Sequence, residues 1–262
     1  MTQAERRRYL IDWLLREGPD PAGVAIPADE PGQRLLLRAL LNVRPPRPVS
    51  REFLEVQDAY LQQECRKRGV TELDTLTPVE EGLYLWQGDI TTLRCDAIVN
   101  AANAQLLGCF YPLHSCIDNI IHSRAGVQLR LECARQMRQQ GHDEPNGRAK
   151  ITPGYNLPSR YVLHTVGPQI RGRVTGRDRA ELAGCYRACL TLAAERGLES
   201  VAFCCISTGE FHFPHEQAAR IAVDTVREFR RTPSTVQKIV FNVFKDTDRQ
   251  IYQALLPAAD GR

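Results

Sequence analysis

The chain has 262 residues, of which 43% are hydrophobic, and its formal net charge is +3. The hydrophobic fraction is enough for a substantial core and excludes a disordered tail. The mild charge gives no indication of a nucleic-acid or membrane partner. No apolar run is long enough for a membrane span or a signal peptide. Nine cysteines, an odd number in a chain too long to need disulfides, favour a cytoplasmic protein with reduced thiols. We expect a monomer because no repeat or coiled coil is present.

The N-terminal third of the chain predicts helices separated by loops. Apolar residues with helical spacing predict helices at 4–16, 34–43 and 51–67. Prolines and glycines predict a loop at 18–32 between the first two helices. No residue here indicates chemistry. We therefore expect residues 1–80 to form a helical extension that packs on a main domain at 81–262.

After residue 82 the pattern changes to strands that alternate with helices. Strands are expected at 83–86, 96–101, 160–166, 200–206 and 238–244, and helices at 116–140, 177–196, 214–230 and 248–256. The helix at 116–140 should break at Gly126. This alternation predicts a layered α/β domain with helices on both faces of its sheet. In such domains ligands bind at the carboxyl ends of the strands.

Two short polar segments follow predicted strands. Gly88 lets the backbone turn closely, and Asp89 after it can accept a hydrogen bond from a donor such as an exocyclic amine, although an ordinary turn also explains this pair. Asn100 and Asn103 stand at the end of the next strand. Two amides with small residues between them suit the recognition of hydroxyl groups, and an Asx turn or a helix cap is the alternative.

The segment at 108–119 is the most informative. Cys109, His114 and Cys116 lie close together in a loop that leads into a helix. Thiolate and imidazole ligands match the preference of zinc for sulfur and nitrogen. Three protein ligands with one open position are typical of catalytic zinc, which polarises a substrate oxygen or lowers the pKa of a bound water. Two buried thiols and a loop histidine remain the alternative explanation.

Two further polar residues follow the cysteines on the predicted helix. Asp118 stands near the helix start, where it either caps the helix or acts as an acid/base or ribose-orienting carboxylate beside the metal. His122 lies one turn later on the same face. We expect His122 to pack against the site or support it rather than to bind metal.

The segment at 206–214 predicts a connection from a strand to a helix. Ser207, Thr208 and Gly209 are small, and a helix N-terminus follows, so backbone N–H groups can point at a phosphate. Phe211 and Phe213 can pack on a sugar or a base. An ordinary turn with two core phenylalanines is the alternative.

Taken together and in this order, these segments resemble the macrodomain family. The matching segments are 88–91, 96–103, 206–209 and 213–214, within a region that spans 82–256. Most hydrolytic macrodomains carry a glycine run where this chain has the cysteines and histidine of 108–116. That replacement, like the helical extension, is similar to the zinc-containing macrodomains of microbes. The resemblance implies a three-layer α/β/α sandwich with a mixed central sheet, and Zn²⁺ as cofactor.

The resemblance also implies roles for individual residues. Asp89 would accept from the adenine amino group beside the Ile90 N–H, and Phe244 would stack on adenine. Asn103 would bind the distal ribose, and Asn100 would support its loop. The implied catalytic residues are Asp118 and Asn103, and the implied metal ligands are Cys109, His114 and Cys116. The backbone that would hold the diphosphate belongs to Ser207, Thr208, Gly209, Glu210 and Phe211. No chemical role follows for the Glu210 side chain, because related enzymes carry a different residue there.

The implied activity is zinc-dependent removal of mono-ADP-ribose from modified proteins. The unit would be ester-linked to Asp or Glu side chains, and free ADP-ribose would be released, so the expected partners are mono-ADP-ribosylated proteins and ADP-ribose. A reader that binds ADP-ribose without hydrolysis is one alternative, although it needs neither Asp118 nor metal ligands. Deacetylation of O-acetyl-ADP-ribose is another. A purely structural zinc domain would need a fourth protein ligand, which we do not find in the sequence.

Overall fold

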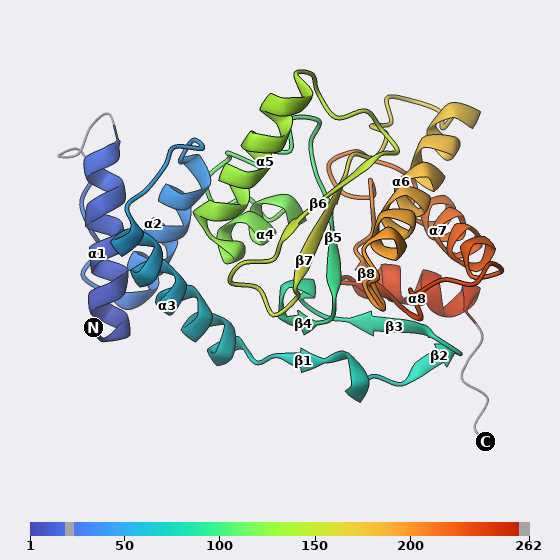
Figure 1. Ribbon diagram of the computed structural model, residues 1–262, viewed down its shortest axis with the longest axis horizontal. Coiled ribbons are helices and arrows are strands. Elements are labelled where there is room, and N and C mark those ends of the chain that lie inside the picture. The colour runs from blue at the N-terminus through green and yellow to red at the C-terminus, as the bar shows by residue number, and fades with distance from the viewer. Residues whose placement is uncertain (19–23, 257–262) are drawn as a thin grey trace.

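The computed structural model describes residues 1–18 and 24–256 (Figure 1). The N-terminal extension is helical, as predicted, with α1 at Gln3–Glu17, α2 at Glu30–Val43 and α3 at Arg51–Arg68. Helix α2 begins earlier than expected because the Asp29 side chain caps it by accepting from the Gly32 N–H. Part of the predicted loop is therefore helix, and residues 19–23 of that loop lie outside the described residues.

A hydrophobic cluster joins the extension to the main domain. Leu10, Ile11, Leu37 and Phe53 are each at most 2% exposed, and Val127 of α5 (Val127–Gln140) belongs to the same cluster. Figure 1 shows α1–α3 together at one end of the molecule, with α4 and α5 between them and the sheet. The burial of apolar side chains thus fixes the extension against α5.

The main domain is built on a seven-stranded mixed sheet in the described residues. Its strand order is β2-β3-β9-β8-β5-β7-β6. The strands are β2 (Pro78–Glu80), β3 (Leu83–Gln87), β9 (Lys238–Val243), β8 (Ser200–Phe203), β5 (Ala97–Ala101), β7 (Tyr161–Thr165) and β6 (Ala149–Pro153). The five central strands are parallel, and β2 and β6 pair antiparallel at the edges. A separate parallel pair joins β1 (Thr71–Glu72) to β4 (Leu93–Arg94).

Helices cover both faces of this sheet, as predicted. Figure 1 shows α4 and α5 on one side of the strands and α6 and α7 on the other. Their bounds are α4 Ile117–Ala125, α6 Gly176–Glu195, α7 His215–Phe229 and α8 Asp246–Leu255; short 3-10 turns lie at Leu73–Thr75 and Ile90–Thr92. The break between α4 and α5 falls at Gly126, whose φ of +99° favours glycine. That break was predicted.

Several boundaries differ from the expected ones. Strands β1, β2, β4 and β6 were not predicted. Thr71–Glu72 and Pro78–Glu80 pair as strands instead of continuing the helical extension. Strand β8 ends at Phe203 rather than at residue 206, because the chain turns there toward the positive φ of Ser207. Helix α7 begins after Pro214, which stands at the N-cap rather than in the first turn.

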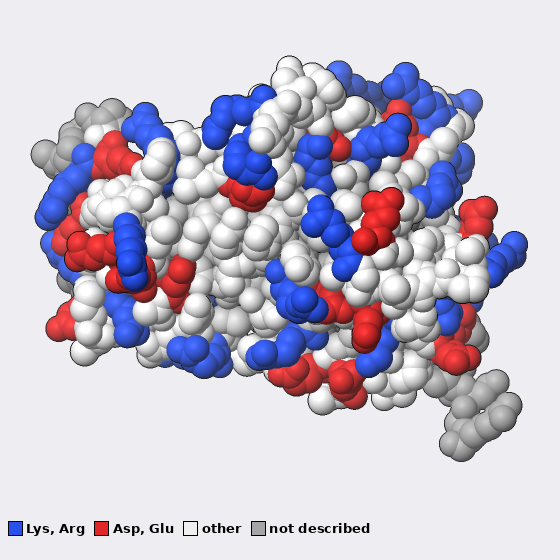
Figure 2. Space-filling view, viewed as in Figure 1, with Lys and Arg blue, Asp and Glu red and all other residues white. Residues whose placement is uncertain are grey.

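The surface carries charges of both signs. Figure 2 shows Lys and Arg side chains interspersed with Asp and Glu side chains over the face that it displays. Within the described residues, no helix has both the length and the apolar character that crossing a bilayer requires.

Candidate active site

A cavity of about 750 Å³ opens at the carboxyl ends of the parallel strands. Asp89 follows β3, Asn103 follows β5, Ser207 follows β8 and Phe244 follows β9, and all four residues line the cavity. The structure therefore brings the predicted segments together. Its walls include these sequence-predicted residues: Asp89, Ile90, Asn103, Cys109, His114, Cys116, Asp118, Ser207, Thr208, Gly209, Glu210, Phe211 and Phe244.

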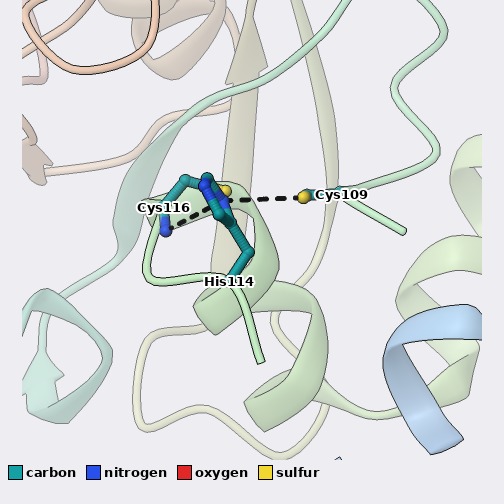
Figure 3. A group of neighbouring side chains, drawn as sticks. All are labelled: Cys109, His114 and Cys116. Carbon is teal, nitrogen blue, oxygen red and sulfur yellow. Dashed lines mark hydrogen bonds between the residues drawn. The ribbon is translucent and has the colours of Figure 1, made fainter. Parts of the chain in front are cut away.

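Three side chains in this wall form a candidate metal centre. The ligand atoms of Cys109, His114 and Cys116 lie within 4.8 Å of one another. Figure 3 shows the three side chains pointing toward one another, and Cys109 Sγ lies 3.7 Å from His114 Nδ1. Two sulfurs and one imidazole nitrogen fit the ligand preference of zinc, and all three residues line the cavity. Burial raises the pKa of the Cys116 thiol to about 12, and a bound cation favours the thiolate.

The loop that carries these ligands has an unusual backbone. Gly108 has a φ of +80°, and a Cβ atom there would approach the His122 ring to 2.8 Å. Glycine is therefore required for the loop to pass over His122. Leu113 also has a positive φ, of 60°, although it is not glycine. Cys116 ends the loop as the N-cap of α4, and its Sγ accepts a hydrogen bond from the Asn119 N–H at 3.4 Å.

Asp118 lies in the first turn of α4 and is 5% exposed. Its Oδ1 accepts a hydrogen bond from Asn100 Nδ2 at 2.8 Å, and its Oδ2 lies 3.4 Å from Asn103 Nδ2. Burial raises the pKa of Asp118 to about 6, against the effect of the Asn100 hydrogen bond. Asn100 itself is fully buried behind Asp118 and does not line the cavity. Its side chain contacts the cavity lining through the hydrogen bond to that carboxylate.

His122 lies one helical turn after Asp118 on α4 and is buried. Its Nε2 is 3.5 Å from Asp118 Oδ1, and neither ring nitrogen has a hydrogen-bond partner among the described residues. Burial lowers the pKa of His122 well below its ordinary value, so the ring is neutral. His164 and Cys133 lie beside it, and the three ligand atoms are within 4.8 Å of one another. His164 Nδ1 faces Asn100 Nδ2 and its Nε2 faces the Thr152 hydroxyl, so that ring is already held by polar partners.

Asp89 also lines the cavity, at the carboxyl end of β3. Its Oδ1 accepts hydrogen bonds from the Thr91 N–H at 3.1 Å and from the Thr91 hydroxyl at 2.7 Å. Its Oδ2 forms an ion pair with Arg124 of α4. Phe244 is 76% exposed at the rim, so its ring is available for stacking. The Ile90 side chain is buried beside Asp89, at 1% exposure.

The loop after β8 presents its backbone to the cavity. Ser207 has a φ of +63°, and its carbonyl accepts from the Phe213 N–H at 2.9 Å. Among hydrogen bonds between described residues, none uses the N–H groups of Gly209, Glu210 or Phe211. These donors are therefore available to an anion. Of the two roles left open for Phe213, the core role holds, because its ring is 1% exposed and belongs to the main hydrophobic cluster.

Some side-chain interactions around the cavity were not predicted from the sequence. The Glu210 carboxylate lies 3.6 Å from His114 Nε2, where it can orient the imidazole while Nδ1 faces the cysteines. Arg124 holds Asp89, and Arg38 of α2 donates to the His114 carbonyl. Glu210 stands within the predicted loop at 206–214, and the sequence indicates no role for its side chain, because only the folded chain brings that carboxylate to His114. The roles of Arg124 and Arg38 could not be predicted, because these residues are distant in the sequence from the residues that they contact.

Comparisons with known proteins identify the family. A family model described as the Macro domain matches residues 99–222. The solved Trypanosoma brucei macrodomain in complex with ADP-ribose superposes with a TM-score of 0.64 at 30% identity, covering 83% of this chain and 94% of that one. The Oceanobacillus iheyensis macrodomain with ADP gives a TM-score of 0.60 at 35% identity, covering 69% of this chain and 93% of that one.

Curated relatives match over nearly the whole chain. A Treponema medium protein named protein-ADP-ribose hydrolase is 56% identical over 260 residues, which is 98% of this chain and all of the relative. A Staphylococcus aureus protein with the same name is 51% identical, over 95% of this chain and 94% of the relative. The chain therefore belongs to the macrodomain family and, within it, to the protein-ADP-ribose hydrolases. The predicted fold and enzyme class are confirmed.

Proposed function

We propose that this chain is a zinc-dependent hydrolase that removes mono-ADP-ribose from modified proteins, where the unit is ester-linked to Asp or Glu side chains. One observation carries the proposal: the Cys109, His114 and Cys116 ligand atoms and the buried Asp118 carboxylate share one cavity. A module that only binds ADP-ribose needs neither of these features. The name of the relatives supports hydrolysis.

ADP-ribose would lie along the cavity from Asp89 to the metal ligands. Asp89 would accept from the adenine amino group, and the exposed Phe244 ring would stack on the base. The N–H groups of Gly209, Glu210 and Phe211 would donate to the diphosphate. The cavity volume of about 750 Å³ is within the range of small-molecule sites.

The distal ribose would then lie beside Asn103 and Asp118. Asp118 would accept a hydrogen bond from a ribose hydroxyl, and the Asn100 and Asn103 amides hold its carboxylate in place for this. Cys109, His114 and Cys116 would hold zinc, which supplies Lewis-acid chemistry at an oxygen next to the anomeric carbon. Water is added across the ester, so that ADP-ribose leaves with a hydroxyl group and the acceptor side chain with a free carboxylate.

A serine substitution at Cys116 tests this proposal. Cys116→Ser keeps a side-chain acceptor for the N-terminus of α4 but removes the thiolate. We expect the variant to fold, to lose its metal and to stop releasing ADP-ribose from a protein modified on Asp or Glu. Cys205→Ala is the matched control, because Cys205 is a thiol of the same cavity outside the metal centre and should leave the zinc content unchanged. Full turnover by metal-free Cys116→Ser would disprove the zinc mechanism.

A further inference from the structure

We propose that Arg38 and Asn42 of α2 are positioning residues for the metal-ligand loop, defined here as residues 108–116. The extension would then complete the active site as well as pack on the main domain. This inference rests on the proposed function, because it concerns the ligands Cys109, His114 and Cys116. It is carried by hydrogen bonds that cross from the extension to the loop.

Asn42 holds the most strained part of the loop. Its side chain is 1% exposed, and its Oδ1 accepts a hydrogen bond from the Leu113 N–H at 3.0 Å. Leu113 has a φ of +60°, which is unfavourable for a residue with a side chain, and it directly precedes His114. The Asn42 Nδ2 donates to Ser123 Oγ of α4 at 2.7 Å. Asn42 therefore ties the backbone at His114 to the helix that begins after Cys116.

Arg38 holds the loop at the ligands themselves. Its Nη2 donates to the His114 carbonyl at 2.6 Å and to Asn119 Oδ1 at 3.0 Å. Asn119 in turn donates through Nδ2 to the Tyr111 carbonyl at 2.9 Å and to the Cys109 carbonyl at 3.3 Å. The Arg38 guanidinium thus acts on one metal ligand directly and on a second through Asn119.

A residue of the main domain also forms hydrogen bonds with the end of α2. Arg130 of α5 donates through Nη1 to the Asn42 carbonyl at 2.9 Å and through Nε to the Leu107 carbonyl at 2.6 Å. Leu107 directly precedes the metal-ligand loop. One buried arginine therefore links the end of α2 to the residue before the loop.

The loop has little hydrophobic packing of its own to define its shape. Phe110, Tyr111 and Leu113 are 37%, 71% and 39% exposed, although they are its large apolar side chains. None of these side chains belongs to a hydrophobic core cluster, although the Arg130 guanidinium lies 4.3 Å from the centre of the Phe110 ring. Hydrogen bonds therefore contribute much of what defines the backbone conformation. Many of those bonds come from Asn42, Arg38 and Asn119.

The extension also offers a matched control. Gln57 of α3 is fully buried, and its Oε1 accepts a hydrogen bond from the Val127 N–H of α5 at 2.9 Å. This contact also joins the extension to the main domain, but it does not involve the metal-ligand loop. If the extension acted only by packing, Gln57→Ala and Asn42→Ala would have the same effect on the metal centre.

The test compares Arg38→Ala, Asn42→Ala and Gln57→Ala with the wild type. Zinc affinity is measured by competition with a chelator, ADP-ribose affinity by calorimetry, and kcat and KM on a mono-ADP-ribosylated protein. In the metal-free proteins, the alkylation rates of Cys109 and Cys116 report the order of the loop. For Arg38→Ala and Asn42→Ala we expect zinc affinity to fall about ten- to hundredfold. We also expect faster alkylation and a lower kcat, with the ADP-ribose Kd and KM within about twofold of wild type. Gln57→Ala should lower the melting temperature and leave zinc affinity unchanged.

Equal zinc affinity and equal alkylation rates in all four proteins would overturn the inference. Should Asn42→Ala fail to fold, the half-buried Arg38 still permits the comparison through Arg38→Gln. A wild type that binds zinc but releases no ADP-ribose would instead refute the proposed function, and the zinc affinities would still test the positioning role. If the wild type bound no zinc, the alkylation rates would test it.

Discussion

The guanidinium of Arg124 in α4 forms an ion pair with the carboxylate of Asp89, the residue proposed to bind the adenine amino group. Arg124 Nη1 also donates to the Thr91 hydroxyl, which itself donates to Asp89. The helix that begins at the candidate metal ligands therefore also orients the carboxylate proposed to bind adenine. Burial lowers the pKa of Arg124 to about 10, and its charge is retained at neutral pH.

Replacing Arg124 should weaken the binding of ADP-ribose. In Arg124→Gln, Asp89 loses the charged partner that fixes its rotamer, and we expect the Kd for ADP-ribose to rise about tenfold, or about 1.4 kcal/mol. Calorimetry measures this, with Arg135→Gln as control because Arg135 pairs with Glu132 on the exposed side of α5. Tighter binding by Arg124→Gln would mean that Arg124 competes with adenine for Asp89.

Replacing Asp118 should slow the reaction without releasing the metal. Asp118→Asn keeps the size of the side chain but loses the carboxylate that the Asn100 amide orients, so we expect kcat to fall roughly 10²- to 10⁴-fold. Zinc content should stay unchanged and the ADP-ribose Kd should change only slightly. Glu144→Gln is the control, since Glu144 is equally buried but lies outside the cavity. Undiminished turnover by Asp118→Asn would remove Asp118 from the mechanism.

Gly108→Ala should damage both stability and metal binding. The positive φ of Gly108 and the approach of a Cβ to the His122 ring predict a loss of about 1–3 kcal/mol in the free energy of unfolding. The shifted loop should also hold zinc less tightly, which chelator competition would detect. Gly176→Ala at the start of α6 is the comparison, because its Cβ meets nothing within 4 Å. Two variants of equal stability would contradict the role of Gly108.

The buried His164 should make the fold sensitive to acid. Burial lowers its pKa from 6.5 to about 3, so between these values the unfolded chain binds a proton that the folded protein excludes. The free energy of unfolding therefore falls as the pH falls through this window, by roughly 1 kcal/mol per pH unit. Denaturant unfolding of the metal-free proteins at several pH values measures this. The free energy of unfolding should depend less steeply on pH in His164→Gln than in the wild type. Identical slopes in both proteins would mean that His164 does not carry this effect.

Much of the fold could be predicted because long periodic segments determine it. The helices at α1, α3 and α6 and the buried strands β5 and β9 end within a few residues of their expected limits. Strand β6 was missed because Lys150 and Pro153 interrupt its apolar pattern, as is common at a sheet edge. The start of α2 was missed because Pro31 and Gly32 suggest a loop, yet proline is well accommodated in a first helical turn.

The residues that line the cavity were predicted better than the side chains that hold them in position. The candidate metal ligands and backbone donors lie in short segments whose spacing indicates their chemistry, and these segments meet in one cavity. The side chains that hold them come from distant positions: 76 residues separate Arg38 from His114, and 35 separate Arg124 from Asp89. No spacing rule in a single sequence joins such pairs, because tertiary packing alone makes them neighbours.

The metal content of the purified protein, measured together with ADP-ribose release before and after chelation, tests the central claim most directly. The substrate is a protein mono-ADP-ribosylated on Asp or Glu. We expect one zinc per chain, loss of release when the metal is stripped, and recovery when zinc is added back. Metal-free protein that turns over at the full rate would contradict zinc dependence. Zinc-loaded protein that binds ADP-ribose but releases none would contradict hydrolysis and leave a binding module.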